Sequence, residues 1–98
     1  MSSQSYEDLL KVFQETENFP TVFIHKFIGK NSDAFLTGVS DWSASKKALY
    51  PSLKETHRRL SADNKHCSLT FEFTASSAEQ IIDILKSTAA IPDLKMVL

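Results

Sequence analysis

The clearest candidate for ligand chemistry is a short polar stretch, Gly29 to Asp33 (GKNSD), which follows a near-continuous apolar run. The pattern described below places it between a strand and a helix. Unpaired N–H groups and the positive end of the helix dipole make a helix N-terminus suitable for holding an anion. We therefore predict a ligand site at the backbone of Gly29, Lys30 and Asn31, with Lys26 as a further counter-ion. The alternative is that this stretch only ends the strand and caps the helix.

Nucleotide binding is not expected at this stretch. It matches neither of the two glycine-rich phosphate-binding signatures, GxxxxGK[ST] and GxGxxG. An acylphosphatase-like hydrolase would need an arginine in an anion-binding loop at this place, and the chain has Lys30 there instead. Hydrolysis therefore stays an alternative of low support.

Three histidines and the single cysteine are the residue types that could bind a metal. His66 and Cys67 are adjacent, so on a strand they point to opposite faces, and the chain has no CxxC pair. We expect no metal site, and we expect His25, His57 and His66 to lie at the surface or at the core boundary. The spacing of Cys67 with Leu69 places its thiol toward the core, which favours packing over nucleophilic chemistry.

Basic residues could form a patch on one face of a sheet. Lys54, Arg58 and Arg59 lie close together in the sequence, and Lys26 falls on a neighbouring strand. The aromatic residues of HCSLTFEF share the predicted core face, and this stretch lacks the RNA-recognition signature of sheet-binding modules. We interpret the basic residues as a solvated, charged edge.

The elements that position these residues follow from the hydrophobic pattern. Residues 5–17 have apolar residues at helical spacing, with Ser5 and Asp8 as a variant capping box. Residues 22–28 are apolar on both parities, which predicts a central strand that ends at Gly29. A second helix begins at Asn31 or Ser32 and ends before Pro51.

The second half of the chain predicts a hairpin, a helix and a last strand. Residues 52–60 form the first arm, and residues 66–74 alternate strictly between apolar and polar, as a half-buried strand does. Ser76 and Glu79 have the spacing of a capping box for a third helix, and Pro92 ends that helix. Residues 93–98 form a short terminal strand.

This order predicts an α+β fold, a ferredoxin-like βαββαβ plait with an additional N-terminal helix. Right-handed crossovers give an antiparallel sheet with the strand order 4-1-3-2, counted along the chain. We expect one domain over residues 1–98, with residues 1–18 as a helical extension. The face of the first strand that carries Ile24, Lys26 and Ile28 is more apolar than a solvated face needs. That face either forms a dimer or partner surface or is covered by the N-terminal helix.

Composition narrows the class of protein. A net charge of -1 and a pI near 6.3 give no general basic surplus for nucleic acid. A single cysteine allows no internal disulfide, which fits a reducing cytoplasm. The first residues lack the features of a signal peptide, and no apolar run has the length of a membrane helix, so we expect a cytoplasmic protein without membrane contact.

Several short motifs resemble the YbeD-like family of small bacterial proteins. They are FPT before the first strand, Lys26 and Gly29 within it, ASSAEQ at the third helix and the terminal MVL, and the resemblance spans about residues 19–98. It implies a plait similar to ACT-type regulatory domains, which bind small effectors, often amino acids. The family has no established catalytic activity, and a link to lipoate metabolism has been proposed for it. The chain has Asn64 and His66 where the family tends to have Gly followed by Tyr.

We expect a non-catalytic regulatory or interaction module that binds a small effector or a protein partner and needs no cofactor. A homodimer through the sheet face or an edge strand is one way in which it could act. The alternatives are a small hydrolase on the same plait and an RNA-binding module. The resemblance supplies no catalytic residue pattern that could be carried over to this chain.

Overall fold

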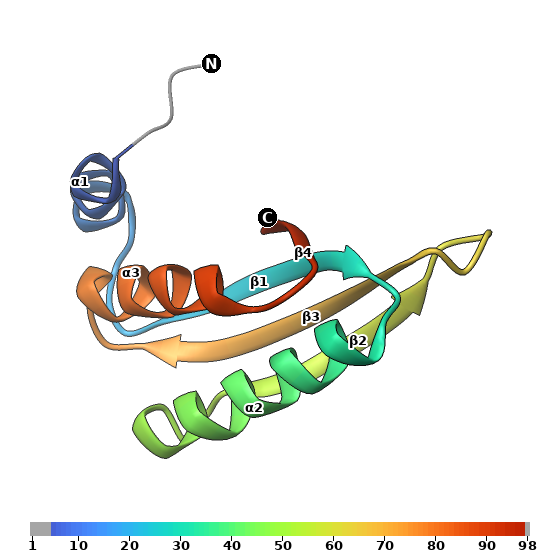
Figure 1. Cartoon of the computed structure of the whole chain (residues 1–98). Helices are drawn as coiled ribbons and strands as arrows, with labels where there is room; N and C mark the ends of the chain where they lie inside the picture. The colour runs from blue at the N-terminus through green and yellow to red at the C-terminus, as the bar shows by residue number, and fades with distance from the viewer. Residues whose placement is uncertain (1–4, 98) are drawn as a thin grey trace.

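Helices and strands follow one another along the chain in the order that the hydrophobic pattern predicts (Figure 1). The computed structural model describes residues 5–97. Its elements are α1 (Tyr6–Thr16), β1 (Thr21–Lys30), α2 (Asp33–Leu49), β2 (Lys54–Leu60), β3 (His66–Ala75), α3 (Ala78–Ser87), the short 3-10 helix η1 (Thr88–Ala90) and β4 (Leu94–Val97). The seven predicted elements are all present. Some boundaries differ from the prediction, because β1 continues through Gly29 to Lys30 and β2 begins only at Lys54.

The four strands form one antiparallel sheet in the order β2-β3-β1-β4, as predicted. β1 pairs with β3 along its whole length, from Thr21 opposite Ala75 to Lys30 opposite His66. β2 is the edge strand beside β3, and its pairing is interrupted between Glu55 and His57. The chain is therefore an α+β protein with β1 and β3 at the centre of its sheet.

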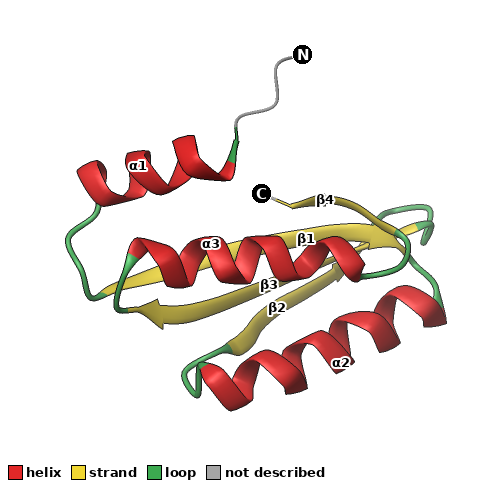
Figure 2. Cartoon of the chain, turned by 60° about the vertical axis from the view of Figure 1, so that its left-hand side comes forward, coloured by secondary structure: helices red, strands yellow, loops and turns green. Residues whose placement is uncertain are grey.

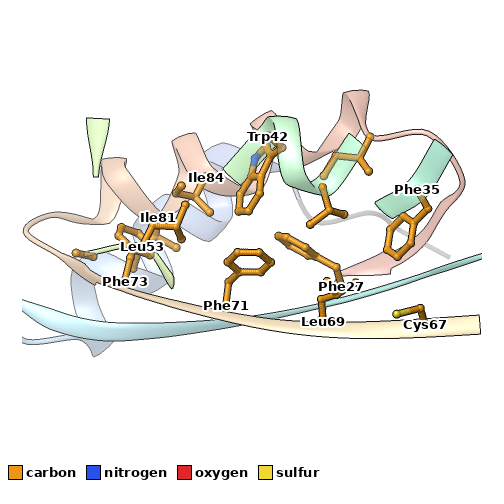
Figure 3. Packing of buried hydrophobic residues seen from close by; sticks show 13 residues of the cluster. Phe27, Phe35, Trp42, Leu53, Cys67, Leu69, Phe71, Phe73, Ile81 and Ile84 are labelled. Atoms are coloured by element: carbon orange, nitrogen blue, oxygen red, sulfur yellow. The ribbon is translucent and has the colours of Figure 1, made fainter. Parts of the chain in front are cut away.

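One face of the sheet is covered by α2 and α3 and carries the core (Figures 1 and 2). Alternate residues of β1 and β3 point toward these helices, and Figure 3 shows their side chains meeting those of the helices. The largest fully buried side chains include Phe27, Phe35, Phe73, Leu53, Leu69, Ile81 and Ile84. Trp42 packs edge-on against both Phe27 and Phe71. The strictly alternating pattern of residues 66–74 thus reports a strand with one buried face.

Two of the predicted helix caps are present and one is displaced. Ser5 accepts a hydrogen bond from the N–H of Asp8, and Ser32 caps α2 by accepting one from the N–H of Phe35. The capping box predicted at Ser76 and Glu79 is wrong, because α3 begins one residue later, with Ser77 as its N-cap. In that frame Gln80 occupies the third helical position, and its side chain accepts from the N–H of Ser76 at 2.8 Å.

The N-terminal helix lies beside α3 and leaves the other sheet face bare. Phe13 of α1 packs edge-on against Phe23 at a ring-centroid distance of 5.3 Å. The ammonium of Lys86 in α3 lies 5.2 Å from the ring centre of Tyr6. Phe23 shares the helix-covered face of β1 with Phe27, so α1 extends the helical layer. The alternative in which this helix covers Ile24 is therefore wrong.

Candidate functional site

The loop between β1 and α2, where the sequence predicts a ligand site, is closed by hydrogen bonds within the chain. The N–H of Lys30 donates to the carbonyl of Asp93 at 3.0 Å, and the N–H of Asn31 donates to the carbonyl of Lys65 at 2.9 Å. The side-chain amide of Asn31 donates to the carbonyl of Asn64. An anion at this loop would have to displace these carbonyls. The loop is therefore hydrogen-bonded to the turn between β2 and β3 and to the turn before β4. The N–H groups of Lys30 and Asn31 do not face an open site.

Gly29 has a packing role at this place. Its backbone lies against the ring of Phe35, so that a Cβ atom added at Gly29 would clash with the ring. Phe35 is fully buried in the first turn of α2. A residue without a side chain is therefore needed at Gly29 to let α2 start close to the sheet.

Lys26 lies away from Gly29, on the bare face of the sheet. Side chains on a strand alternate between the two faces, so Lys26 and Lys30 point to the face opposite to Gly29. The structure thus brings Lys26 and Lys30 to one face about 13 Å apart along the strand, and it separates both from Gly29. The four predicted residues do not form a single site.

The bare face, which we call the open face, has an apolar stripe along β1. Val22 and Ile24 are 57% and 59% exposed, and Ile28 of the same face is half-buried. Met96 of β4 is paired with Ile28 and is 51% exposed. No described helix packs on this stripe. It is the part of the predicted partner surface that is exposed to solvent.

Basic and imidazole side chains flank this stripe on its β2 side. The register puts His57 beside Thr70 and Arg59 beside Ser68, so both point to the open face, and His66 begins β3 on the same face. Arg58 points to the other face, where it binds Glu55 in a two-pronged ion pair of 2.7 and 2.9 Å. The predicted basic patch therefore includes Lys26, Lys54 and Arg59 but not Arg58.

Among the strand residues of the open face, Glu72 is the only carboxylate. It is paired with Lys54 at 3.3 Å. Lys26 and Arg59 have no ion-pair partner within residues 5–97. The open face is therefore basic at the end of β1 that carries Ile28 and apolar at the end that carries Val22.

The helix-covered face holds an isolated buried histidine that the sequence analysis misplaced. His25 is 0% exposed, and neither ring nitrogen has a hydrogen-bond partner. Its ring stacks on Phe73 and lies 4.6 Å from the ring centre of Phe23. Burial lowers the pKa of His25 from 6.5 to about 4, so it is neutral at physiological pH. Its parity with Phe23 and Phe27 was the signal that could have placed it in the core.

The remaining groups with shifted pKa values are structural or isolated. The hydroxyl of Tyr50 donates to Asp83 at 2.7 Å, and burial together with this carboxylate raises the pKa of Tyr50 to about 12. The same hydrogen bond lowers the pKa of Asp83. Burial raises the pKa of the Cys67 thiol, which keeps it protonated as predicted for a packed residue. Within residues 5–97 there is no group of three or more side chains that could hold a metal ion.

A trough on the outer surface lies between α2 and the segment that follows α3. Its volume is about 770 Å³, and its lining includes Asp33, Asp41, Trp42 and Pro92. The indole N–H of Trp42 is already engaged, since it donates to the hydroxyl of Ser87 at 2.7 Å. Lys46 also lines the trough but is paired with Asp83, so the two carboxylates Asp33 and Asp41 would suit a small cationic ligand better than an anion.

Comparison with known proteins places the chain in a family. A family model described as "Protein of unknown function (DUF493)" matches residues 14–98, which is most of the chain. The chain belongs to the DUF493 family. This is the family of the YbeD-like proteins, so the resemblance seen in the sequence is confirmed. No curated protein matches this DUF493 chain.

The DUF493 chain is also similar to a solved structure. It aligns with the solution structure of protein HP0495 from H. pylori at a TM-score of 0.63 and 14% sequence identity. The alignment covers 85% of this chain and 86% of that chain. At this identity the similarity supports the fold alone. Within residues 5–97, none of the helices combines the length and the apolar character that crossing a membrane requires.

Proposed function

We propose that this DUF493 chain is a small, cytoplasmic, non-catalytic interaction module of a regulatory kind, which binds a protein partner through its open face. We also infer that its β1-α2-β2-β3-α3-β4 order is a ferredoxin-like plait of the ACT type. The strand order and the similarity to HP0495 support this finer description of the fold.

The exposed apolar stripe on β1 carries this proposal. Val22, Ile24 and Met96 are each more than half exposed, because the helices α2 and α3 cover the other face of the sheet. Apolar surface left in water forgoes roughly 25 cal/mol for each Å² that burial would gain. These side chains therefore add little to the stability of the isolated domain. Exposed apolar side chains next to charged ones are typical of a surface that binds another molecule.

The distribution of ionisable groups favours binding over hydrolysis. A catalytic site brings groups with shifted pKa values together in a cleft. Here His25 is buried among phenylalanine rings. Tyr50 and Asp83 form a hydrogen bond between the end of α2 and α3. Cys67 is buried, and the adjacent His66 points to the opposite face of the sheet, so the two do not form a thiol–imidazole pair. This scatter supports the module over the acylphosphatase-like alternative.

RNA binding through the sheet has little support from the side chains. RNA-binding sheets stack bases on exposed aromatic rings. The aromatic residues of β1 and β3, namely Phe23, Phe27, Phe71 and Phe73, belong to the helix-covered face. A small effector remains a second candidate, and the trough beside Trp42 has room for it.

The proposal is tested with the full-length protein and one matched pair of variants. Ile24→Glu places a charge on the stripe, and Leu49→Glu places it on an equally exposed apolar residue at the end of α2, 65% exposed. Short peptides selected from a random displayed library for binding to the wild type should lose affinity for Ile24→Glu and retain it for Leu49→Glu. Binders that are indifferent to Ile24→Glu would overturn the proposal.

Self-association is measured on the same samples. Light scattering over a range of concentrations tells whether the wild type dimerises. A dimer that Ile24→Glu dissociates and Leu49→Glu does not would identify the stripe as an interface between copies of the chain. A protein that stays monomeric and still binds the selected peptides would support a different partner.

A further inference from the structure

The open face has a hollow at its basic end, built around a short side chain. In the register, Ser68 of β3 stands between Ile28 of β1 and Arg59 of β2. The side chain of Ser68 is much shorter than its two neighbours, so the surface dips at this point. Lys26 and His66 border the same hollow, whose volume is about 230 Å³.

Two other cationic side chains of β2 are held in ion pairs within the chain. Lys54 is paired with Glu72, and Arg58 is paired with Glu55 on the opposite face. Neither Lys26 nor Arg59 has an ion-pair partner within the described part of the chain. Two unpaired cationic side chains thus meet at a hollow with a hydroxyl at its floor.

The nearest carboxylate in the adjoining turn is occupied. Asp63 accepts hydrogen bonds from the hydroxyl of Ser61 at 2.7 Å and from the N–H of Lys65 at 3.0 Å. It therefore stabilises the turn between β2 and β3. Within residues 5–97, no carboxylate forms an ion pair with Lys26 or Arg59 at the hollow, so a carboxylate of a bound partner could pair with both.

We propose that this hollow is a carboxylate-binding subsite, which receives an Asp or Glu side chain of the partner that the open face binds. The inference rests on the proposed function and specifies the chemistry of the partner. The guanidinium of Arg59 can bind a carboxylate with two parallel hydrogen bonds, Lys26 adds a second charge and Ser68 a hydroxyl donor.

The position of the hollow also sets the shape of the partner segment. Ile28 borders the hollow, and Ile24 and Val22 follow along the same face of β1. Six residues of strand separate Ile28 from Val22, a distance of roughly 20 Å. An extended segment of about seven residues would therefore place an acidic residue in the hollow and apolar residues on the stripe.

Charge complementarity favours an acidic peptide over the other occupants. A second copy of the chain would present the same face, on which Glu72 is the only strand carboxylate and already binds Lys54. A nucleic acid would meet the apolar stripe and find no aromatic ring on which to stack a base. An acidic segment with apolar residues matches both halves of the face.

The two neighbouring arginines of β2 provide a matched test. Arg59→Gln removes the positive charge at the hollow, and Arg58→Gln removes a positive charge from the opposite face of the sheet. Both arginines are exposed. Peptides selected on the wild-type protein should contain Asp or Glu next to apolar residues. Their affinity should fall roughly tenfold or more for Arg59→Gln, remain within about twofold for Arg58→Gln and weaken as salt is added.

A double-mutant cycle completes the test. Replacing the selected acidic residue of the peptide by its amide should weaken binding to the wild type and have little further effect on Arg59→Gln. Peptides that need Ile24 but bind Arg59→Gln normally would overturn this inference and leave the proposed function standing. Peptides indifferent to Ile24 would remove both. Tighter binding of a single-stranded oligonucleotide, lost in Arg59→Gln, would make phosphate the occupant and overturn the acidic-peptide inference.

Discussion

Among single residues, His25 links the stability of the fold to pH. The folded state holds its imidazole neutral, with the pKa lowered from 6.5 to about 4 by burial, and offers no hydrogen-bond partner to either nitrogen. The unfolded chain therefore binds more protons than the folded chain between these two values. The stability that depends on neutral His25 is complete above pH 6.5 and is lost as the pH falls toward about 4, by up to about 3 kcal/mol.

His25→Leu should remove this pH dependence. We expect the variant to be as stable as the wild type at pH 7 or more stable by about 1–2 kcal/mol, because a buried polar ring without partners is replaced by an apolar side chain. Urea denaturation at neutral and mildly acidic pH measures both effects. His57→Leu, at an exposed residue of β2, is the control and should follow the wild-type pH profile. A His25→Leu protein with the wild-type acid sensitivity would contradict the assignment.

Gly29 provides a second prediction for a single residue. Gly29→Ala should destabilise the protein by about 1–3 kcal/mol, since the new methyl group overlaps the ring of Phe35 and the buried ring has little room to move. Combining it with Phe35→Leu should cost less than the sum of the two single changes, because the smaller side chain admits the methyl group. Denaturant midpoints of the four proteins measure the coupling. Additive costs would show that Gly29 is needed for another reason.

Between elements, a polar contact joins the two core helices at one end. Asp83 of α3 accepts from the hydroxyl of Tyr50 at 2.7 Å and from the ammonium of Lys46 at 3.2 Å, and both donors come from the end of α2. Trp42 and Ser87 form a second contact between these helices. The two contacts fix how α2 and α3 lie side by side above the sheet.

Tyr50→Phe should lower the free energy of unfolding by about 1–2 kcal/mol, because it removes a charge-assisted hydrogen bond. Because the folded state raises the pKa of Tyr50 from 10.0 to about 12, the wild type should also lose stability as the pH rises between these values, and the variant should lose less. Thermal melts at neutral and alkaline pH measure this. Tyr6→Phe, at a residue of α1 that is 42% exposed and keeps its ring in this change, is the control and should change stability by less than about 0.5 kcal/mol.

For the molecule as a whole, the two faces of the sheet contribute differently to the free energy of unfolding. Phe27→Ala on the covered face should cost about 3–5 kcal/mol, a large part of the roughly 5–15 kcal/mol that stabilises a domain. Ile24→Thr on the open face should cost less than about 0.5 kcal/mol, because the isoleucine is more than half exposed. Denaturation curves of both variants test this. A large loss for Ile24→Thr would mean that the stripe stabilises the isolated chain.

Most of the architecture could be predicted because the strands and helices carry clear periodic patterns. The order of the elements and the right-handed crossover rule predicted the strand order, and the apolar character of residues 22–28 and the alternation of residues 66–74 agreed with it. The misplaced details depend on contacts between distant segments. Gly29 looks like the end of a strand until Phe35 is placed on it, and the N–H groups of Lys30 and Asn31 look free until Asp93 and Lys65 come near.

The candidate site was predicted only in part. The apolar face of β1 was recognised from Ile24 and Ile28, but the hollow was not, since it depends on which β2 residue stands beside Ser68. The interruption of pairing between Glu55 and His57 shifts the alternation of β2, which brings Arg59 to the open face and Arg58 to the other. Strand alternation alone indicates that these two adjacent arginines point to opposite faces, but it does not tell which of them lies on the open face.

The shortness of β4 has a consequence for β1. β4 pairs only with Phe27, Ile28 and Gly29, so the same edge of β1 from Thr21 to Lys26 has no strand neighbour among residues 5–97. In an antiparallel pair, every second N–H of a strand points away from its partner. In hydrogen–deuterium exchange, alternate amides of Thr21–Lys26 should therefore exchange quickly although β1 is a central strand, and those of Phe27–Gly29 should all exchange slowly.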